Sequence, residues 1–113
     1  MKRMVERFGD KALQRFLHKE EILLVKSYKT AAGFWAVKEA FSKAIGTGIG
    51  SECSFFDMKI YKDLHGAPKL SLSKKLVERF TLLDVAISIT HDGDYAVAVV
   101  DVKSTTPNKI EQF

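Results

Sequence analysis

Residues 30–50 read TAAGFWAVKEAFSKAIGTGIG, and the spacing of apolar residues in this stretch decides the fold. Thr30 is an acceptable N-cap, and the glycines from Gly46 onward are typical of a helix C-terminus. The sequence therefore predicts a helix from Ala31 to Ile45 that ends at a Gly-rich loop. The apolar residues of this helix recur at helical intervals: Phe34, Val37, Phe41, Ala44 and Ile45.

Two shorter helical segments are predicted upstream of this helix. One is expected from Lys19 to about Lys26. The other lies nearer the start of the chain and is broken near Gly9. Its apolar residues have roughly helical spacing: Val5, Phe8, Leu13, Phe16 and Leu17.

Beyond residue 50 the periodicity changes to that of strands. Apolar and polar residues interleave over residues 55–61, and a turn over residues 65–68 leads to a short strand over residues 69–72. Ser73 can cap a helix that runs to about Phe80. Residues 85–90 and 95–102 predict two further strands, joined at Asp92-Gly93 by a two-residue hairpin turn.

Helices first and antiparallel strands later are typical of an α+β domain. We expect a small antiparallel sheet with packed helices over residues 1–103, and a loose polar tail over residues 104–113. The chain has 113 residues, of which 46% are hydrophobic and 28% charged, so its composition is that of one small globular domain.

The composition also argues against several classes of protein. No uncharged stretch is long enough to span a bilayer as a helix, and the first residues lack the long apolar region of a signal peptide. Cys53 is the one cysteine, so we exclude an internal disulfide framework and interpret this residue as a small structural hydrophobe. These features favour a cytoplasmic protein with no membrane partner.

The positive charge is concentrated at the start of the chain. Residues 1–29 contain eight lysines and arginines against four acidic residues, whereas residues 30–113 contain ten of each. Such a segment attracts an acidic partner, although a solvated helix face explains the charge equally well. Nucleic acid is disfavoured as the partner, because the basic residues are not interleaved with aromatic residues and no nucleic-acid motif is present.

Glu39 and Lys43 are four residues apart and therefore lie on one face of the predicted helix. One interpretation is a surface ion pair worth a few tenths of a kcal/mol. Another is a site in which the carboxylate holds Mg²⁺ and the ammonium binds a phosphate oxygen, with the glycines of residues 46–50 close by. Those glycines are a weak signal, since they also end the helix, and they do not form a Walker loop.

Residues 35–50, WAVKEAFSKAIGTGIG, resemble the signature of holo-acyl-carrier-protein synthases, the small bacterial type of 4′-phosphopantetheinyl transferase. A second match is ISITH at residues 87–91, followed by YAVA at residues 95–98. Smaller matches include RFL at residues 15–17, SFFD at residues 54–57 and GAP at residues 66–68. The resemblance runs in order from about residue 7 to residue 102.

The resemblance implies transfer of phosphopantetheine from coenzyme A to a serine of apo-acyl carrier protein, with Mg²⁺, in fatty acid biosynthesis. Glu39 matches the family's metal-binding glutamate, and Lys43 matches the lysine that contacts phosphate. We therefore expect Glu39 and Lys43 to be the catalytic residues. The other matching positions are those of the coenzyme A site: Gly46, Gly48 and Gly50 beside the pyrophosphate, Thr90 and His91 near the nucleotide, and Pro68 in the adenine-side loop.

The resemblance also implies two kinds of partner. Acyl carrier protein is acidic, and the residues expected to bind it are Arg7, Lys11 and Arg15. Family members are typically homotrimers whose sites lie between subunits, so Glu39 and Lys43 would face His91 of a neighbouring chain.

This sequence departs from the family pattern in two places. Members usually begin with a Gly-x-Asp strand whose aspartate is a second metal ligand, and we expect that strand to be missing here, where the sequence begins Met1-Lys2-Arg3. Phe34 stands where many members have an arginine that holds the 3′-phosphate of coenzyme A. The alternative reading is therefore a truncated, non-catalytic module that binds coenzyme A or acyl carrier protein.

Overall fold

The computed structural model describes residues 9–105, and it confirms the predicted α+β class. Residues 1–8, which include Arg7, lie outside the described residues, as do residues 106–113. The elements run in this order: α2 Asp10–Leu13, α3 Lys19–Ile22, α4 Tyr28–Ala44, the 3₁₀ turn η1 Phe55–Asp57, β1 Met58–Lys62, β2 Pro68–Leu72, α5 Lys74–Phe80, β3 Leu82–Asp92 and β4 Tyr95–Ser104.

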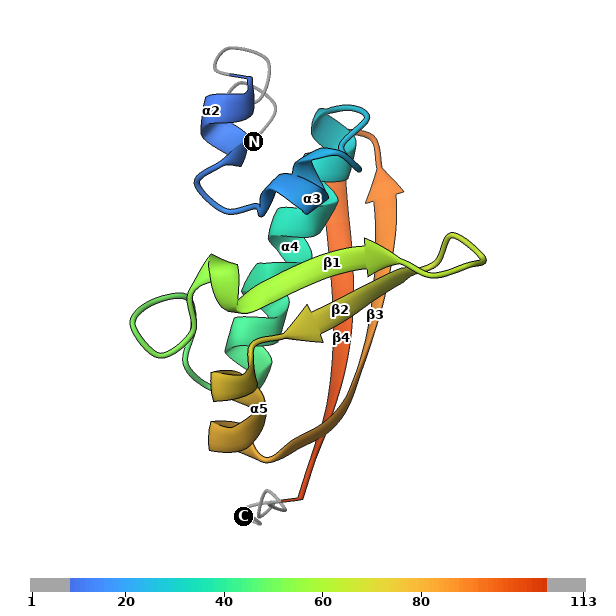
Figure 1. The fold of residues 1–113 in the computed structure, drawn as a ribbon. Coiled ribbons are helices and arrows are strands. Elements are labelled where there is room, and N and C mark those ends of the chain that lie inside the picture. The colour runs from blue at the N-terminus through green and yellow to red at the C-terminus, as the bar shows by residue number, and fades with distance from the viewer. Residues whose placement is uncertain (1–8, 106–113) are drawn as a thin grey trace, which may run out of the picture.

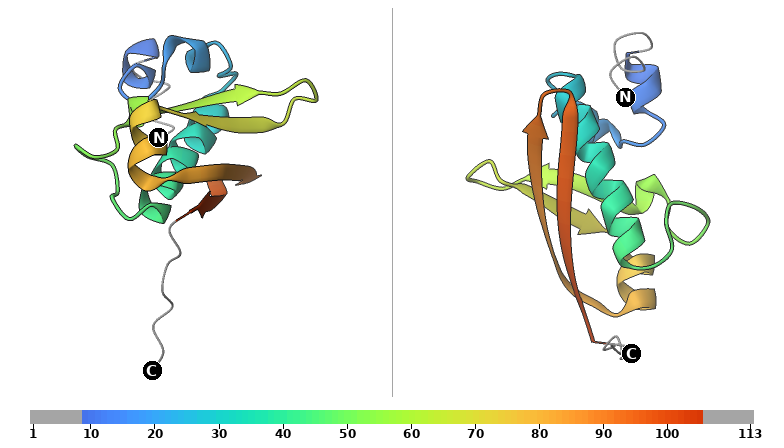
Figure 2. Two further views of the ribbon diagram at one scale, coloured as in Figure 1. Left: turned by 60° about the horizontal axis from the view of Figure 1, so that its bottom comes forward. Right: turned by 180° about the vertical axis from the view of Figure 1, so that it is seen from behind.

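The strands form two antiparallel hairpins, β1 with β2 and β3 with β4, and each hairpin is a separate two-stranded sheet. The long helix α4 runs between the two hairpins (Figures 1 and 2). The β1–β2 hairpin crosses one side of α4, and the longer β3–β4 hairpin covers the other side. Helix α4 therefore lies between the two hairpins, at the centre of the fold.

The core forms where the apolar side of α4 meets the hairpins. The helix buries Ala31, Phe34, Val37 and Phe41, as its apolar spacing predicted. The hairpin residues that pack against this core alternate along the strands, because successive strand residues point to opposite faces. They are Val85, Ile87 and Ile89 on β3 and Ala98, Val100 and Val102 on β4.

Helix α4 begins three residues earlier than predicted, which corrects the assignment of Thr30 as its N-cap. Ser27 is the cap, and its Oγ accepts a hydrogen bond of 3.2 Å from the backbone N–H of Lys29. The apolar periodicity begins only at Ala31, so it did not reveal the first turn of the helix.

Two other expectations differ from the structure in detail. Residues 55–57 form a 3₁₀ turn capped by Ser54 rather than the start of a strand. The β3–β4 turn consists of Gly93 and Asp94, because Asp92 pairs with Tyr95. Gly93 has φ of 60°, the conformation that a two-residue turn needs at a leading glycine.

The ends of two elements also differ from prediction. Helix α3 ends at Ile22, earlier than the Lys26 that was expected. Ser104 is the last residue of β4 rather than the first residue of a loose tail. The helix capped by Ser73 is confirmed as α5, with Ser73 Oγ accepting the backbone N–H of Leu76.

Candidate active site on the open side of helix α4

Glu39 and Lys43 lie on the side of α4 that the hairpins leave open. Each helical residue is rotated by about 100° from the one before it, so positions four apart form a ridge along the helix. Trp35, Glu39 and Lys43 form such a ridge; Trp35 is 40% exposed, Glu39 is half-buried and Lys43 is exposed. The predicted placement of Glu39 and Lys43 on one accessible helix face is therefore what the structure has.

Glu39 and Lys43 do not form an ion pair with each other or with any other side chain among residues 9–105. The structure therefore does not show the surface ion pair between Glu39 and Lys43 that was one of the two interpretations of the sequence. The backbone carbonyl of Glu39 accepts a hydrogen bond of 2.8 Å from Ser42 Oγ, but no side chain of residues 9–105 pairs with its carboxylate. With respect to these residues, the Glu39 carboxylate and the Lys43 ammonium remain available to a ligand.

The rotation of α4 is fixed by the residue next to Glu39. Lys38 is completely buried, and its Nζ donates hydrogen bonds to Glu21 Oε1 at 2.8 Å, to Phe16 O at 2.8 Å and to Phe55 O at 3.1 Å. Burial lowers the pKa of Lys38, and the Glu21 carboxylate acts in the opposite direction. Because Lys38 must point inward to meet these partners, Glu39 points toward the open side.

Sequence analysis missed this supporting role of Lys38 and Glu21. Glu21 is also fully buried; it accepts the backbone N–H of Ile60 at Oε2 (2.9 Å) and of His18 at Oε1 (2.8 Å). The pair thereby connects α3, α4 and β1. The sequence offered no local signal for it, because Glu21 and Lys38 are 17 residues apart and each resembles a surface charge.

The Gly-rich loop that follows α4 uses its backbone donors within the chain. Gly46 N–H donates to Lys43 O, Gly48 N–H donates to Ser42 O, and Gly50 N–H donates to Cys53 O. Gly46 and Gly48 have φ of 90° and 65°, a region that favours glycine. The loop thus closes the end of α4, and the three N–H groups are not directed at a vacant ligand position. The assignment of these glycines to the pyrophosphate stays a prediction.

Thr90 and His91 lie near the end of β3, at the other end of α4 from the Gly-rich loop. Both residues are exposed, and His91 is paired in register with Ala96 of β4. The His91 ring lies against Gly33 of its own chain, where a Cβ would be 3.3 Å from His91 Cε1. Gly33 is six residues before Glu39, about 9 Å along the helix and on a different side of it. Within one chain, His91 therefore does not face Glu39 directly.

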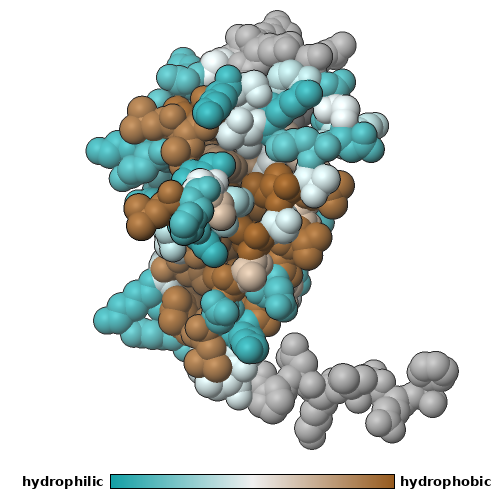
Figure 3. All heavy atoms as spheres, turned by 90° about the vertical axis from the view of Figure 1, so that its right-hand side faces the viewer, coloured by the Kyte–Doolittle hydropathy of each residue, from teal (hydrophilic) through white to brown (hydrophobic). Residues whose placement is uncertain are grey.

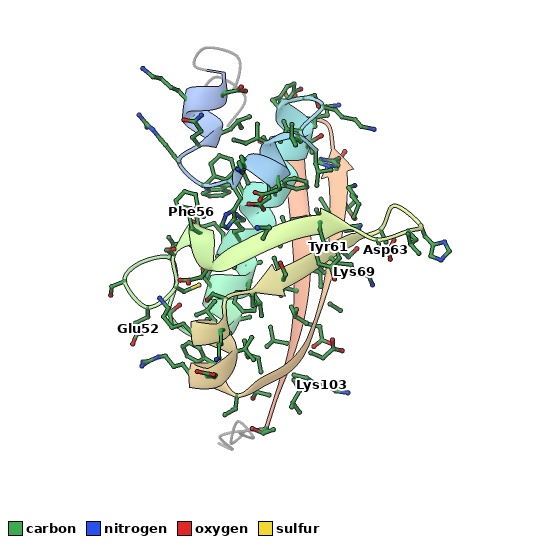
Figure 4. The ribbon with its side chains drawn as sticks, viewed as in Figure 1. Glu52, Phe56, Tyr61, Asp63, Lys69 and Lys103 are labelled. Carbon is green, nitrogen blue, oxygen red and sulfur yellow. The ribbon has the colours of Figure 1, made fainter. Side chains whose placement is uncertain are left out.

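Pro68 begins β2 at the projecting end of the β1–β2 hairpin. Asp63 lies at this tip, with Tyr61 and Lys69 on the two strands behind it (Figure 4). Asp63 Oδ1 accepts the backbone N–H groups of His65 and Ala67, both at 2.9 Å. The hydrogen bond from Ala67 is the main reason that the pKa of Asp63 lies below its ordinary value. The loop before Pro68 is thus held by a carboxylate that sequence analysis did not single out.

The remaining predicted residues are placed as follows. Lys11 is an exposed residue of α2, and Arg15 is exposed just after that helix. Phe34 and Phe41 are in the core, as expected. Cys53 is fully buried, and burial raises the pKa of its thiol, in agreement with a structural role.

Glu39 is the candidate metal ligand among the described residues. Residues 9–105 contain no group of three or more His, Cys, Asp or Glu side chains arranged to hold a metal. Mg²⁺ usually keeps several waters and takes one or two carboxylates together with substrate phosphates. The carboxylate of Glu39, which no side chain of the described residues pairs with, lies one helical turn from the Lys43 ammonium and fits such a site. No helix among the described residues is both long and apolar enough to cross a membrane.

Comparison with known proteins supports the family resemblance. The family model of the 4′-phosphopantetheinyl transferase superfamily matches residues 1–100. The holo-[acyl-carrier-protein] synthase of Sulfurimonas denitrificans is 58% identical over 107 residues, covering 95% of this chain and 88% of the relative. That of Aliarcobacter butzleri is 54% identical over 100 residues, covering 88% and 85%.

Solved structures give the same result for the fold. The crystal structure of Helicobacter pylori holo-[acyl-carrier-protein] synthase in complex with coenzyme A has a TM-score of 0.83 and 46% identity, covering 88% of this chain and 87% of that one. The Bacillus anthracis synthase in complex with CoA (3′,5′-ADP) has a TM-score of 0.74 and 36% identity, with coverage of 89% and 87%. This chain therefore belongs to the holo-acyl-carrier-protein synthase family of the 4′-phosphopantetheinyl transferase superfamily.

Proposed function

We propose that this chain transfers 4′-phosphopantetheine from coenzyme A to a serine of apo-acyl carrier protein, and so serves fatty acid biosynthesis in the cytoplasm. The observation that carries the proposal is the Glu39–Lys43 ridge on the open side of α4, which forms no ion pair within residues 9–105, in a chain 58% identical to a holo-[acyl-carrier-protein] synthase. The related Helicobacter pylori structure contains coenzyme A, which supports coenzyme A as the donor.

The reaction forms one bond and breaks one bond at phosphorus. The serine oxygen attacks the phosphorus that bears the pantetheine, the bond to the leaving adenosine 3′,5′-bisphosphate breaks, and the serine proton passes to a water molecule. The Glu39 carboxylate orients that water and would hold the metal. The Lys43 ammonium binds a phosphate oxygen and offsets negative charge as the bond breaks. Bound Mg²⁺ would neutralise charge on the pyrophosphate.

The remaining predicted residues surround this pair. Gly46, Gly48 and Gly50 lie beside the pyrophosphate, where the absence of side chains leaves room for it. Thr90 and His91 bind the nucleotide end of coenzyme A, and Pro68 shapes the loop on the adenine side. Arg7, Lys11 and Arg15 attract the acidic carrier protein by their charge.

We further propose that the protein is a homotrimer with sites between subunits. His91 and Glu39 lie on different sides of α4 in one chain, so a neighbouring chain is needed to bring a His91 to Glu39. The outward face of the β3–β4 hairpin supports this assembly: Tyr95, Val97 and Val99 are 78%, 56% and 63% exposed. Apolar side chains gather on the side of the molecule shown in Figure 3. Exposed apolar area of this kind is typical of an interaction surface.

The transfer reaction is tested with purified protein, coenzyme A and apo-acyl carrier protein over a Mg²⁺ titration, with mass spectrometry of the carrier protein as the readout. Glu39→Gln keeps the size of the side chain and removes its charge, so it should abolish transfer while the melting temperature stays near that of the parent. The matched control is Glu78→Gln on α5, an exposed glutamate whose ion pair with Lys74 is 3.7 Å long. That variant should retain transfer.

Two outcomes would contradict the proposal. Near-parental turnover in Glu39→Gln would remove Glu39 from the mechanism. Binding of coenzyme A by the parent chain without any transfer at saturating Mg²⁺ would favour the non-catalytic binding module instead.

A further inference from the structure

Helix α4 has a glycine in its interior at the point where β3 crosses it. Gly33 is buried and has an ordinary helical backbone, so its conformation does not require glycine. Glycine in a helix interior costs about 1 kcal/mol relative to alanine. The reason for glycine at this position must therefore be space.

Two side chains of β3 occupy the space that a side chain at position 33 would need. A Cβ built on Gly33 would lie 2.9 Å from Ile89 Cγ2, closer than real Cβ contacts. It would lie 3.3 Å from Cε1 and 3.5 Å from Nε2 of His91. Ile89 and His91 are two residues apart on β3 and thus point to the same face, toward α4.

The end of the hairpin is also tied to the start of α4. Tyr28 Oη donates a hydrogen bond of 2.5 Å to Asp94 Oδ1 in the β3–β4 turn. His91 therefore lies between this hydrogen bond at the turn and the Ile89 contact with Gly33. The backbone of β3 cannot move away from α4 without breaking either the Tyr28–Asp94 hydrogen bond or the Ile89 contact. The exposed His91 ring, in contrast, can rotate outward if a side chain at position 33 displaces it.

We propose that Gly33 is a positioning residue for His91: because it has no side chain, the imidazole can lie against α4 in the orientation that binds coenzyme A. This inference rests on the proposed role of His91 at the nucleotide end of coenzyme A. In Gly33→Ala the new methyl group meets Ile89 and the imidazole. Ile89 is β-branched, stiff and half-buried, whereas His91 is exposed, so His91 is displaced more easily.

The test is a double-mutant cycle with coenzyme A affinity measured by calorimetry. Gly33→Ala and His91→Ala should each weaken binding about tenfold, the size expected for losing a hydrogen bond to a charged group. The double variant should bind no more weakly than His91→Ala alone, because Gly33 acts through the imidazole. Any loss of stability caused by the Ile89 contact should persist in the double variant, and thermal unfolding measures it separately.

A second background keeps the test decisive if Gly33→Ala folds poorly. Ile89→Ala removes Cγ2, the atom that would lie 2.9 Å from a Cβ at position 33. Of the two β3 side chains, the added methyl group then contacts His91 and no longer Ile89. Adding Gly33→Ala in this background should still weaken coenzyme A binding about tenfold. In the parent protein, a nuclear Overhauser effect between the Hα protons of Gly33 and Hε1 of His91 should report the contact directly.

The results separate this inference from the proposed function. Parental affinity in Gly33→Ala, or an equal further loss when Gly33→Ala is added to His91→Ala, would overturn the positioning role. Absence of the Overhauser effect would overturn the contact itself. Parental affinity in His91→Ala would instead overturn the assignment of His91 to the coenzyme A site.

Discussion

Lys38 Nζ lies 2.8 Å from Glu21 Oε1, and neither side chain is accessible to solvent. A buried charge without a partner is costly, so each residue depends on the other. The two residues also bind backbone groups of four other residues: Phe16, His18, Phe55 and Ile60. This connection holds α3, α4 and β1 together directly behind the Glu39–Lys43 ridge.

We expect Lys38→Met to lower the free energy of unfolding by about 3–5 kcal/mol, because it leaves the Glu21 carboxylate buried and unpaired. The double variant Lys38→Met/Glu21→Gln should lose less than the sum of the two single variants. Its glutamine is neutral and can still accept the backbone N–H of Ile60 or His18. Urea denaturation measures the stability of Lys38→Met, of Glu21→Gln and of the double variant.

The control for this pair is Lys74→Met, which removes an exposed pair with Glu78 on α5. It should change stability by less than about 0.5 kcal/mol. A Lys38→Met protein as stable as this control would show that the buried pair contributes nothing net to folding.

The second prediction concerns stability in acid. Partial burial raises the pKa of Asp57, but hydrogen bonds from Ser54 and Ser73 and the Lys75 ammonium outweigh burial and hold the pKa below its ordinary value. A carboxyl with a lowered pKa in the folded state stabilises the protein above its unfolded-state pKa, and this contribution is lost as pH falls through the folded-state pKa. Asp57→Asn should therefore be less stable than the parent at pH 7, with the difference shrinking as the pH is lowered.

Thermal unfolding over a pH series measures this effect. Lys75→Met removes one of the interactions that lower the pKa of Asp57, an ion pair of 3.3 Å, and should reproduce part of the change. A constant difference between Asp57→Asn and the parent from neutral to acid pH would contradict the assignment.

The third prediction concerns the basic segment. Lys11→Glu/Arg15→Glu should weaken binding of acyl carrier protein and leave coenzyme A binding unchanged. The effect should diminish as salt increases, because exposed charges are screened. Surface plasmon resonance at low and high salt measures it.

A control with the same change of net charge is Lys74→Glu/Lys103→Glu. Lys103 and α5 lie at the opposite end of the molecule from α2 (Figures 1 and 4). Equal weakening by both double variants would show that overall charge, rather than the basic segment, attracts the carrier protein.

The fourth prediction concerns assembly. Val97→Lys/Val99→Lys places two charges on the outward face of the β3–β4 hairpin and should convert a trimer to a monomer, with loss of transfer. Light scattering coupled to size exclusion gives the mass. The control is Leu23→Lys: Leu23 is also an exposed apolar residue, 85% exposed, but lies outside this hairpin, so the variant should leave the trimer intact. A monomeric parent, or an unchanged mass in the double variant, would overturn the proposed assembly.

The sequence alone was enough to predict the elements that build the site. The period of apolar residues over 31–45 identified α4, and helical geometry then placed Glu39 and Lys43 on one face. Alternation over residues 85–90, the apolar run at residues 95–102 and the turn signal between them identified the β3–β4 hairpin. These features were predictable because they depend on neighbours close in the chain.

Only the tertiary structure decided which charges are buried and which remain open. Lys38, Glu39 and Lys43 lie within six residues, yet Lys38 is inside the protein because Glu21 and the carbonyls of Phe16 and Phe55 come to meet it. The start of α4 at Ser27 and the contact of His91 with Gly33 likewise depend on parts of the chain that local spacing does not connect. Local periodicity fixes which residues share a face, whereas the cost of burying a charge or filling a space depends on the partners that folding brings to it.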